Sequence, residues 1–259
     1  ESLLGFWSQA GADACFLEAP ANRLAQRESP PPRPVGRPAA AGPAPTRPPP
    51  ALAEAIEQAR ALAAGANDLA ELEAAITAYD GCGLKFEGAR RAVFSRGAAN
   101  APVMIIGEGP GAEEDAQGAP FVGRAGKLLD RMLAAAGLTD RVFITNTVFW
   151  RPPGNRTPTP AEQMVCAPFV ERAIGLVKPR FLLLAGGAAA KAVLQRDEGI
   201  LSLRGRWFDW KSADGALQLP ALPTLHPAFL LRQPGAKKRA WADLLTLTER
   251  LDRPERPEA

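Results

Sequence analysis

The sequence predicts an α/β fold: a three-layer α/β/α sandwich with a central, mostly parallel, four-stranded sheet. Short apolar runs of strand length alternate with longer amphipathic segments, an order typical of parallel sheets with helices on both faces. Hydrophobic residues make up 46% of the 259 residues, which is enough for one sizeable core. We expect the buried strands at residues 103–106, 142–146, 181–185 and 222–225.

Apolar residues at helical spacing predict helices before, between and after these strands. Alanine, leucine and glutamate predict two helices within residues 51–79, with Asn67 or Asp68 capping the second. Pro160 suits the first turn of a helix that continues to residue 177. The remaining helices are expected at 124–136, 188–195 and 236–251.

The chain divides into four parts by composition. Residues 1–28 carry apolar side chains at near-helical spacing and predict a short docking helix. Residues 29–50 contain ten prolines, which prevent a helix or central strand and predict a semi-rigid linker. Residues 51–252 form the predicted globular domain, and residues 253–259 a tail.

Charge and cysteine usage restrict the class of protein. A net charge of +3 is too small to mark a nucleic-acid binder, so any DNA-binding surface must come from local clustering. Cys15, Cys82 and Cys166 are odd in number and widely spaced, which favours a reducing compartment over a disulfide framework. Without a long apolar run or a secretory signal, we expect a cytoplasmic monomer with no membrane partner.

Three polar or glycine-rich segments follow the predicted strands, at 107–121, 146–156 and 226–232. Sites in parallel sheets lie beyond the carboxyl ends of the strands, so these segments are the candidates. The loop Gly107-Glu108-Gly109-Pro110-Gly111 could form a tight turn or approach a phosphate. It lacks both the dinucleotide-binding spacing and the P-loop lysine, which disfavours a nucleotide site.

The same segments carry three ordered motifs. They are Gly107–Asp115 with Gly118–Gly126, then Thr145-Asn146 leading into Arg151–Pro160, and finally His226–Arg232. Together they resemble the motifs of the family 4 uracil-DNA glycosylases, over about residues 72–250. The resemblance implies a DNA repair enzyme that flips uracil out of single- or double-stranded DNA. It would excise the base hydrolytically as a monofunctional enzyme and leave an abasic site.

The resemblance also implies the catalytic residues. Glu108 would orient or activate water and stabilise the cationic sugar, and His226 would donate to uracil O2 as charge grows there. Glu114 is a second acidic candidate. Its alternative is a solvated acidic run that the helix dipole favours at a helix start.

The uracil pocket is expected around Gly107, Gly109 and Gly111. Phe121 would stack on the flipped base, although a core aromatic is the alternative. Asn146 could read the uracil edge with an amide that both donates and accepts, and a turn-forming asparagine is its alternative.

DNA contacts are expected from the segment after His226 and from nearby basic residues. Leu230 would fill the gap left by the extruded base, with a buried strand as the alternative. Ala228 stands where the family typically has serine, so one phosphate-binding hydroxyl is missing. The full set of expected DNA-binding residues is Arg124, Arg156, Pro227, Ala228, Leu230 and Arg232.

The family typically holds a [4Fe–4S] cluster with four cysteines, and this chain matches two of them, Cys82 and Cys166. Tyr79 and Trp150 occupy the other positions and cannot supply thiolates. We therefore expect no cluster and no metal, with the two aromatics filling its volume. This loss and Ala228 keep open a catalytically weak uracil- or abasic-site-binding protein. A small-molecule nucleotide binder using the glycine loop is the third hypothesis.

Overall fold

The computed structural model describes residues 52–253. The expected N-terminal helix, the proline-rich linker and the tail from residue 254 onward lie outside the described residues.

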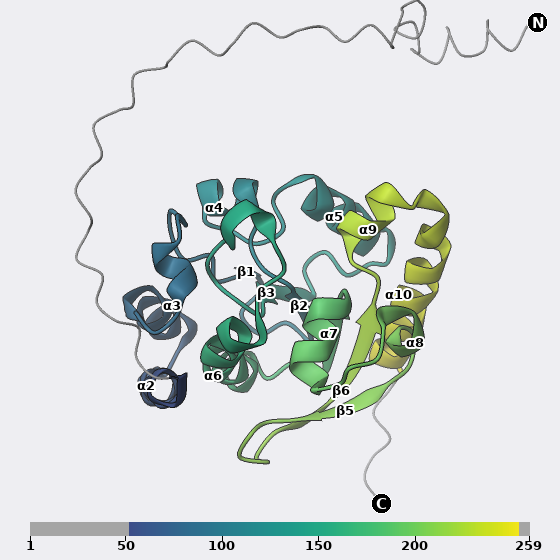
Figure 1. Ribbon diagram of the computed structural model, residues 1–259. Coiled ribbons are helices and arrows are strands. Elements are labelled where there is room, and N and C mark those ends of the chain that lie inside the picture. Colours follow the sequence, from purple (N-terminus) through teal and green to yellow (C-terminus); the bar gives the residue numbers. More distant parts are fainter. Residues whose placement is uncertain (1–51, 254–259) are drawn as a thin grey trace, which may run out of the picture. The chain divides into compact units, whose positions relative to one another are not determined.

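A six-stranded sheet with the order β1-β3-β2-β4-β6-β5 forms the middle layer (Figure 1). Its four central strands are mutually parallel and confirm the predicted ones: β2 (Val103–Gly107), β3 (Val142–Asn146), β4 (Phe181–Ala185) and β6 (Gln218–Thr224). The expected count of four omitted two antiparallel edge strands, β1 (Arg96–Gly97) and β5 (Phe208–Lys211). β1 has only two residues and β5 exposes alternate side chains, so neither has the continuous apolar run of a buried strand.

Four helices cover one face of the sheet: α2 (Leu52–Gly65), α3 (Leu69–Ala78), α6 (Pro160–Val177) and α7 (Gly187–Leu194). Asp68 caps α3 by accepting from the Glu71 amide. Thr159 and Glu162 form a capping box that starts α6, with Pro160 in its first turn as expected. These signals are local, which is why the sequence alone located both helix starts.

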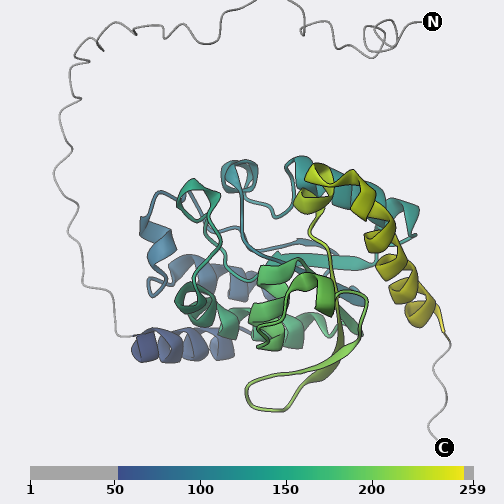
Figure 2. The same ribbon diagram turned by 45° about the vertical axis from the view of Figure 1, so that its right-hand side comes forward.

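The opposite face packs against α5 (Arg124–Ala135) and α10 (Lys237–Asp252). The views in Figures 1 and 2 show α2 and α6 on one side of the sheet and α10 on the other. The three-layer architecture is therefore confirmed. None of the helices within residues 52–253 combines the length and apolar character needed to cross a membrane.

Short elements gather where the parallel strands end. They include α4 (Ala112–Gln117) after β2 and α9 (Pro227–Arg232) after β6, which lie near α5 at the upper edge of Figure 1. The other short elements are η2 (Gly83–Phe86), η3 (Pro153–Asn155), α8 (Ile200–Leu203) and η4 (Pro234–Ala236).

Candidate active site

Gly107 is the point where three elements of the site meet. It ends β2 and is paired in register with Asn146, the last residue of β3. A Cβ atom at Gly107 would lie 2.5 Å from Phe121 Cε2 and equally close to the Asn146 amide oxygen. Glycine is required here because no side chain fits between the phenyl ring and the amide. The structure therefore brings three of the predicted uracil-binding residues into one place.

Asn146 points a buried acceptor into this site. Its side chain is 1% exposed, and its Oδ1 atom has no hydrogen-bond partner within the described part of the chain. An unpaired buried oxygen costs free energy, on the order of 1–3 kcal/mol, unless a ligand supplies a donor.

Phe121 adopts a left-handed backbone conformation, with a φ of 55°. Arg96 supports this conformation by donating to the carbonyls of Pro120 and Phe121, at 2.8 and 3.1 Å, and by pairing with Asp130 at 2.6 Å. The ring of Phe121 lies 5.6 Å from that of His226, tilted by 32°. Sequence reasoning missed Arg96 because nothing near it in sequence signals these contacts.

His226 caps α9, and this contact fixes which ring nitrogen carries the proton. Its Nδ1 atom accepts from the Ala228 amide at 3.1 Å, so the neutral ring carries its proton on Nε2. Burial, together with the charge of Arg232 and against an opposing effect of Glu114, lowers the pKa of His226 to about 4. At neutral pH the residue is therefore an uncharged donor through Nε2.

Gly186 makes room for that ring. It has a φ of 101°, and a Cβ atom there would lie 2.9 Å from the His226 Cβ. The residue that follows β4 is thus glycine for both conformational and steric reasons.

Glu108 follows Gly107 and is only partly buried. Its carboxylate makes no hydrogen bond or ion pair with any residue in 52–253, so it is available to a water molecule or a ligand. Its backbone is fixed by Thr147, whose hydroxyl donates to the Glu108 carbonyl at 2.6 Å and whose amide donates to the Gly107 carbonyl at 2.9 Å. Gln163 in turn donates to the Thr147 hydroxyl at 3.3 Å. Thr147 was missed by sequence reasoning, and its only signal was a polar residue directly after Asn146.

The Glu114 carboxylate holds two backbone segments of the site together. Its carboxylate accepts from the amides of Gly111, Val122 and Gly123, at 3.1, 3.0 and 2.9 Å. It therefore joins the glycine loop to the segment that carries Phe121. These contacts differ from the solvated alternative, and a water-activating role for Glu114 stays a prediction.

The other two glycines of the first motif have structural contacts. Gly109 packs against Val148, because a Cβ atom there would lie 2.9 Å from its Cγ2. Gly111 is the N-cap residue of α4.

Leu230 does not lie on the surface in this conformation, and its role in filling the gap left by the extruded base stays a prediction. The segment after His226 forms helix α9, and helical periodicity turns Pro227 and Leu230 inward. Leu230 is fully buried in a cluster with Leu128, Leu225 and Ala240. Phe229, Ala228 and Leu231 are only partly buried, and Arg232 is exposed.

The two arginines expected to bind DNA outside α9 differ in their surroundings. Arg156 forms a two-bond ion pair with Glu162, at 2.6 and 2.9 Å, and a second pair with Glu87 at 3.5 Å. These carboxylates compete with any phosphate. Arg124 is exposed at the start of α5 and makes no such pair within residues 52–253.

Cys82 and Cys166 are buried together with the two aromatic residues of the cluster region. The two thiols are hydrogen-bonded to each other; this bond lowers the pKa of Cys82, whereas burial raises that of Cys166. Tyr79 donates its hydroxyl to the Ala55 carbonyl at 2.7 Å, and its ring lies 6.5 Å from that of Trp150. Burial and the two neighbouring thiols raise the pKa of Tyr79. This set does not fit a four-cysteine cluster, and the described residues contain no group of three or more potential metal ligands.

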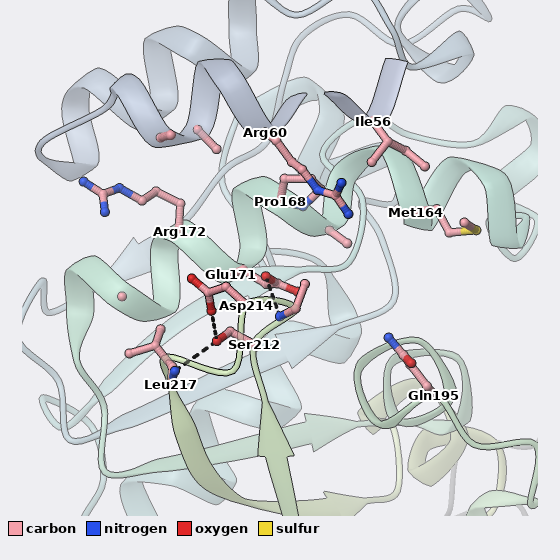
Figure 3. A pocket seen from close by; sticks show the side chains of 15 residues that line it. Ile56, Arg60, Met164, Pro168, Glu171, Arg172, Gln195, Ser212, Asp214 and Leu217 are labelled. Atoms are coloured by element: carbon pink, nitrogen blue, oxygen red, sulfur yellow. Dashed lines mark hydrogen bonds between the residues drawn. The ribbon is translucent and has the colours of Figure 1, made fainter. Parts of the chain in front are cut away.

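Two cavities lie away from these residues. One, of about 620 Å³, lies between α2, α6 and the β5–β6 turn (Figure 3). Several of its polar side chains are engaged: Glu171 accepts from the Ala213 amide, and Ser212 donates to Asp214. The other, of about 730 Å³, lies between α6 and α7 and reaches the site only at Thr147. Neither cavity is lined by Gly107, Asn146 or His226.

The fold and the site define a class of protein: an α/β domain whose strand ends present an amide, a neutral histidine, an aromatic ring and an uncommitted carboxylate. The model of the uracil DNA glycosylase superfamily matches residues 94–245. The chain is 39% identical over 183 residues to a type-4 uracil-DNA glycosylase of Pyrobaculum aerophilum, covering 68% of this chain and 91% of that relative.

Two further relatives carry the same description. The type-4 enzyme of Sulfurisphaera tokodaii is 36% identical over 171 residues, covering 64% of this chain and 77% of the relative. That of Thermotoga maritima is 39% identical over 142 residues, covering 54% and 71%. The chain belongs to the uracil-DNA glycosylase superfamily, and by that membership it is an enzyme of this class.

Proposed function

We propose that the protein extrudes uracil from DNA into the junction around Gly107, hydrolyses the C1′–N1 bond and leaves an abasic site for repair. The observation that carries this proposal is the unpaired Oδ1 atom of buried Asn146. Uracil has an N3–H donor beside the O4 acceptor, and a side-chain amide complements both. Phe121 packs against Gly107 beside the same amide, so an aromatic ring is close enough to stack on a bound base.

The chemistry divides between two residues. As the C1′–N1 bond breaks, its electron pair leaves with uracil, and negative charge grows on O2. The His226 Nε2–H donates to that oxygen, and donation needs no protonated imidazole. Water then bonds to C1′ of the cationic sugar, and Glu108, which has no competing partner in the described chain, accepts its proton.

The test is a uracil-containing oligonucleotide, followed by alkali to cleave at abasic sites. Glu108→Gln keeps the volume and removes the proton acceptor, so it should lower the single-turnover rate at least about 100-fold. Asn146→Leu should abolish excision, because it removes both hydrogen-bonding groups at nearly constant volume. A thymine-containing oligonucleotide is the control for background cleavage.

The outcomes separate the three hypotheses. Excision lost in both variants supports the glycosylase. Tight binding to uracil or abasic DNA without base release would instead support the DNA-binding protein. Binding of free nucleotide but not of DNA would support the nucleotide binder.

We further propose that the protein works without an iron–sulfur cluster. The two-thiol, two-aromatic set around Tyr79 supports this, because Tyr79 and Trp150 supply no thiolate and the Tyr79 ring packs 5.2 Å from that of Phe169. Anaerobically purified protein should contain less than one iron per chain and no broad visible absorbance. Four irons per chain would contradict the proposal.

Buried thiols at Cys82 and Cys166 are compatible with a reducing compartment, so the cytoplasm is the proposed location. A monomer is the proposed form. Light scattering at micromolar concentration tests the monomer directly, because a dimer doubles the mass.

A further inference from the structure

Residues 86–91, which we name the Phe86 rim, expose an aromatic side chain beside two arginines. Phe86 is 67% exposed, more than any other large hydrophobic residue in the described chain. Arg90 and Arg91 are also exposed, and neither side chain forms a hydrogen bond or an ion pair within residues 52–253. Lys85, by contrast, is occupied by Asp80 and two backbone carbonyls.

Three contacts attach the rim to the end of the sheet that carries the active site. The Arg90 amide donates to Asp115 of α4 at 2.8 Å, and Arg91 packs along Gly118 at the end of that helix. Glu87 pairs with Arg156, which lies in the segment between β3 and α6. Because α4 follows β2 and Arg156 follows β3, the rim lies on the same side as Glu108 and Asn146.

We propose that the Phe86 rim binds the single-stranded DNA that flanks the extruded uracil. Phe86 stacks on a base beyond the two nucleotides next to uracil, and Arg90 and Arg91 contact phosphates. An aromatic face with nearby uncommitted cations suits single strands of any sequence, because every base has a face to stack while paired bases are already stacked. This inference rests on the proposed glycosylase function and adds a preference for unpaired flanks.

The test compares Phe86→Ala with Leu245→Ala, a matched removal of an exposed apolar side chain on α10. The substrates are a single-stranded 25-mer with central uracil, the same strand in a duplex, and a trinucleotide with central uracil. Phe86→Ala should raise KM for the single-stranded 25-mer about 5- to 100-fold, with little change in kcat. The duplex should be affected less, the trinucleotide should not be affected, and Leu245→Ala should resemble the wild type.

The arginines are tested by salt dependence. For a uracil-free single-stranded 25-mer, the double variant Arg90→Ala, Arg91→Ala should reduce the slope of log Kd against log salt by about 1.4, because each phosphate contact contributes about 0.7 on single strands. Equal losses on all three uracil substrates, no loss in Phe86→Ala, or an unchanged slope would overturn the proposal. If the wild-type protein excises no uracil, the proposed function fails, whereas binding to the uracil-free strand still tests the rim.

Discussion

Glu114 provides the sharpest test of how the active site is held together. Its carboxylate accepts three amide hydrogen bonds from two different loops. Glu114→Gln keeps one oxygen, which can still serve Val122 and Gly123, but places an NH₂ group against the Gly111 amide. The two remaining bonds lose their charge, and one donor is left facing another donor.

The expected cost follows from these changes. Hydrogen bonds to a charged group contribute about 1.5–3 kcal/mol, neutral ones about 0.5–1.5 kcal/mol, and an unsatisfied donor costs about 1–3 kcal/mol. Because Glu114 is only partly buried, we expect a loss of about 2–4 kcal/mol in the free energy of unfolding. For a domain of this size that lowers Tm by roughly 5–15 °C.

Urea denaturation and single-turnover excision measure the two consequences. The matched control is Glu113→Gln, because the exposed Glu113 carboxylate makes no hydrogen bond or ion pair within residues 52–253. We expect Glu114→Gln to lose stability and, through displacement of the Phe121 segment, about 10- to 100-fold in rate. A large loss of rate at unchanged stability would refute this structural role of Glu114 and favour a water-activating one.

Three further predictions follow from the same geometry. The folded pKa of His226 is about 4, below the ordinary 6.5, so the unfolded chain takes up a proton first as pH falls. The contribution of His226 to the free energy of unfolding is therefore complete above pH 6.5 and falls by up to about 3 kcal/mol as pH drops through 4. Denaturation at pH 7 and pH 4 should show this loss in the wild type but not in His226→Asn, and the excision rate should have no inflection near pH 6.5. Gly107→Ala should lower excision at least about 100-fold, since its methyl group would overlap Phe121 and Asn146, whereas Gly65→Ala, with open space around it, should leave the rate unchanged. Thr147→Val should reduce kcat about 5- to 10-fold through the lost bond to the Glu108 carbonyl, and the idea fails if Thr147→Ser does not restore most of it.

Local signals explain what the sequence predicted well. Three of the four parallel strands, β2, β3 and β4, are buried along their whole length, and β6 is buried over its last four residues, which is why their sequences are mostly apolar. Asp68 and Thr159 mark helix starts through bonds to amides three residues away. The glycine loop, Asn146 and His226 were expected at the ends of three parallel strands, and the structure brings Gly107, Asn146 and Phe121 together there.

Tertiary packing decided which side chains remain available to a ligand. Glu114 binds amides eight and nine residues away in another loop, and Arg96 supports Phe121 from 25 positions earlier in the chain. Such partners depend on how loops from different strands meet, which no periodicity reports. Leu230 is a further example, because the helix that follows His226 turns its side chain into the core. The sequence by itself therefore determined the sheet, its helices and the chemical groups of the site. Only the folded chain determined that Glu108 is uncommitted while Glu114 is not, because burial and hydrogen-bond partners are properties of residues distant in sequence.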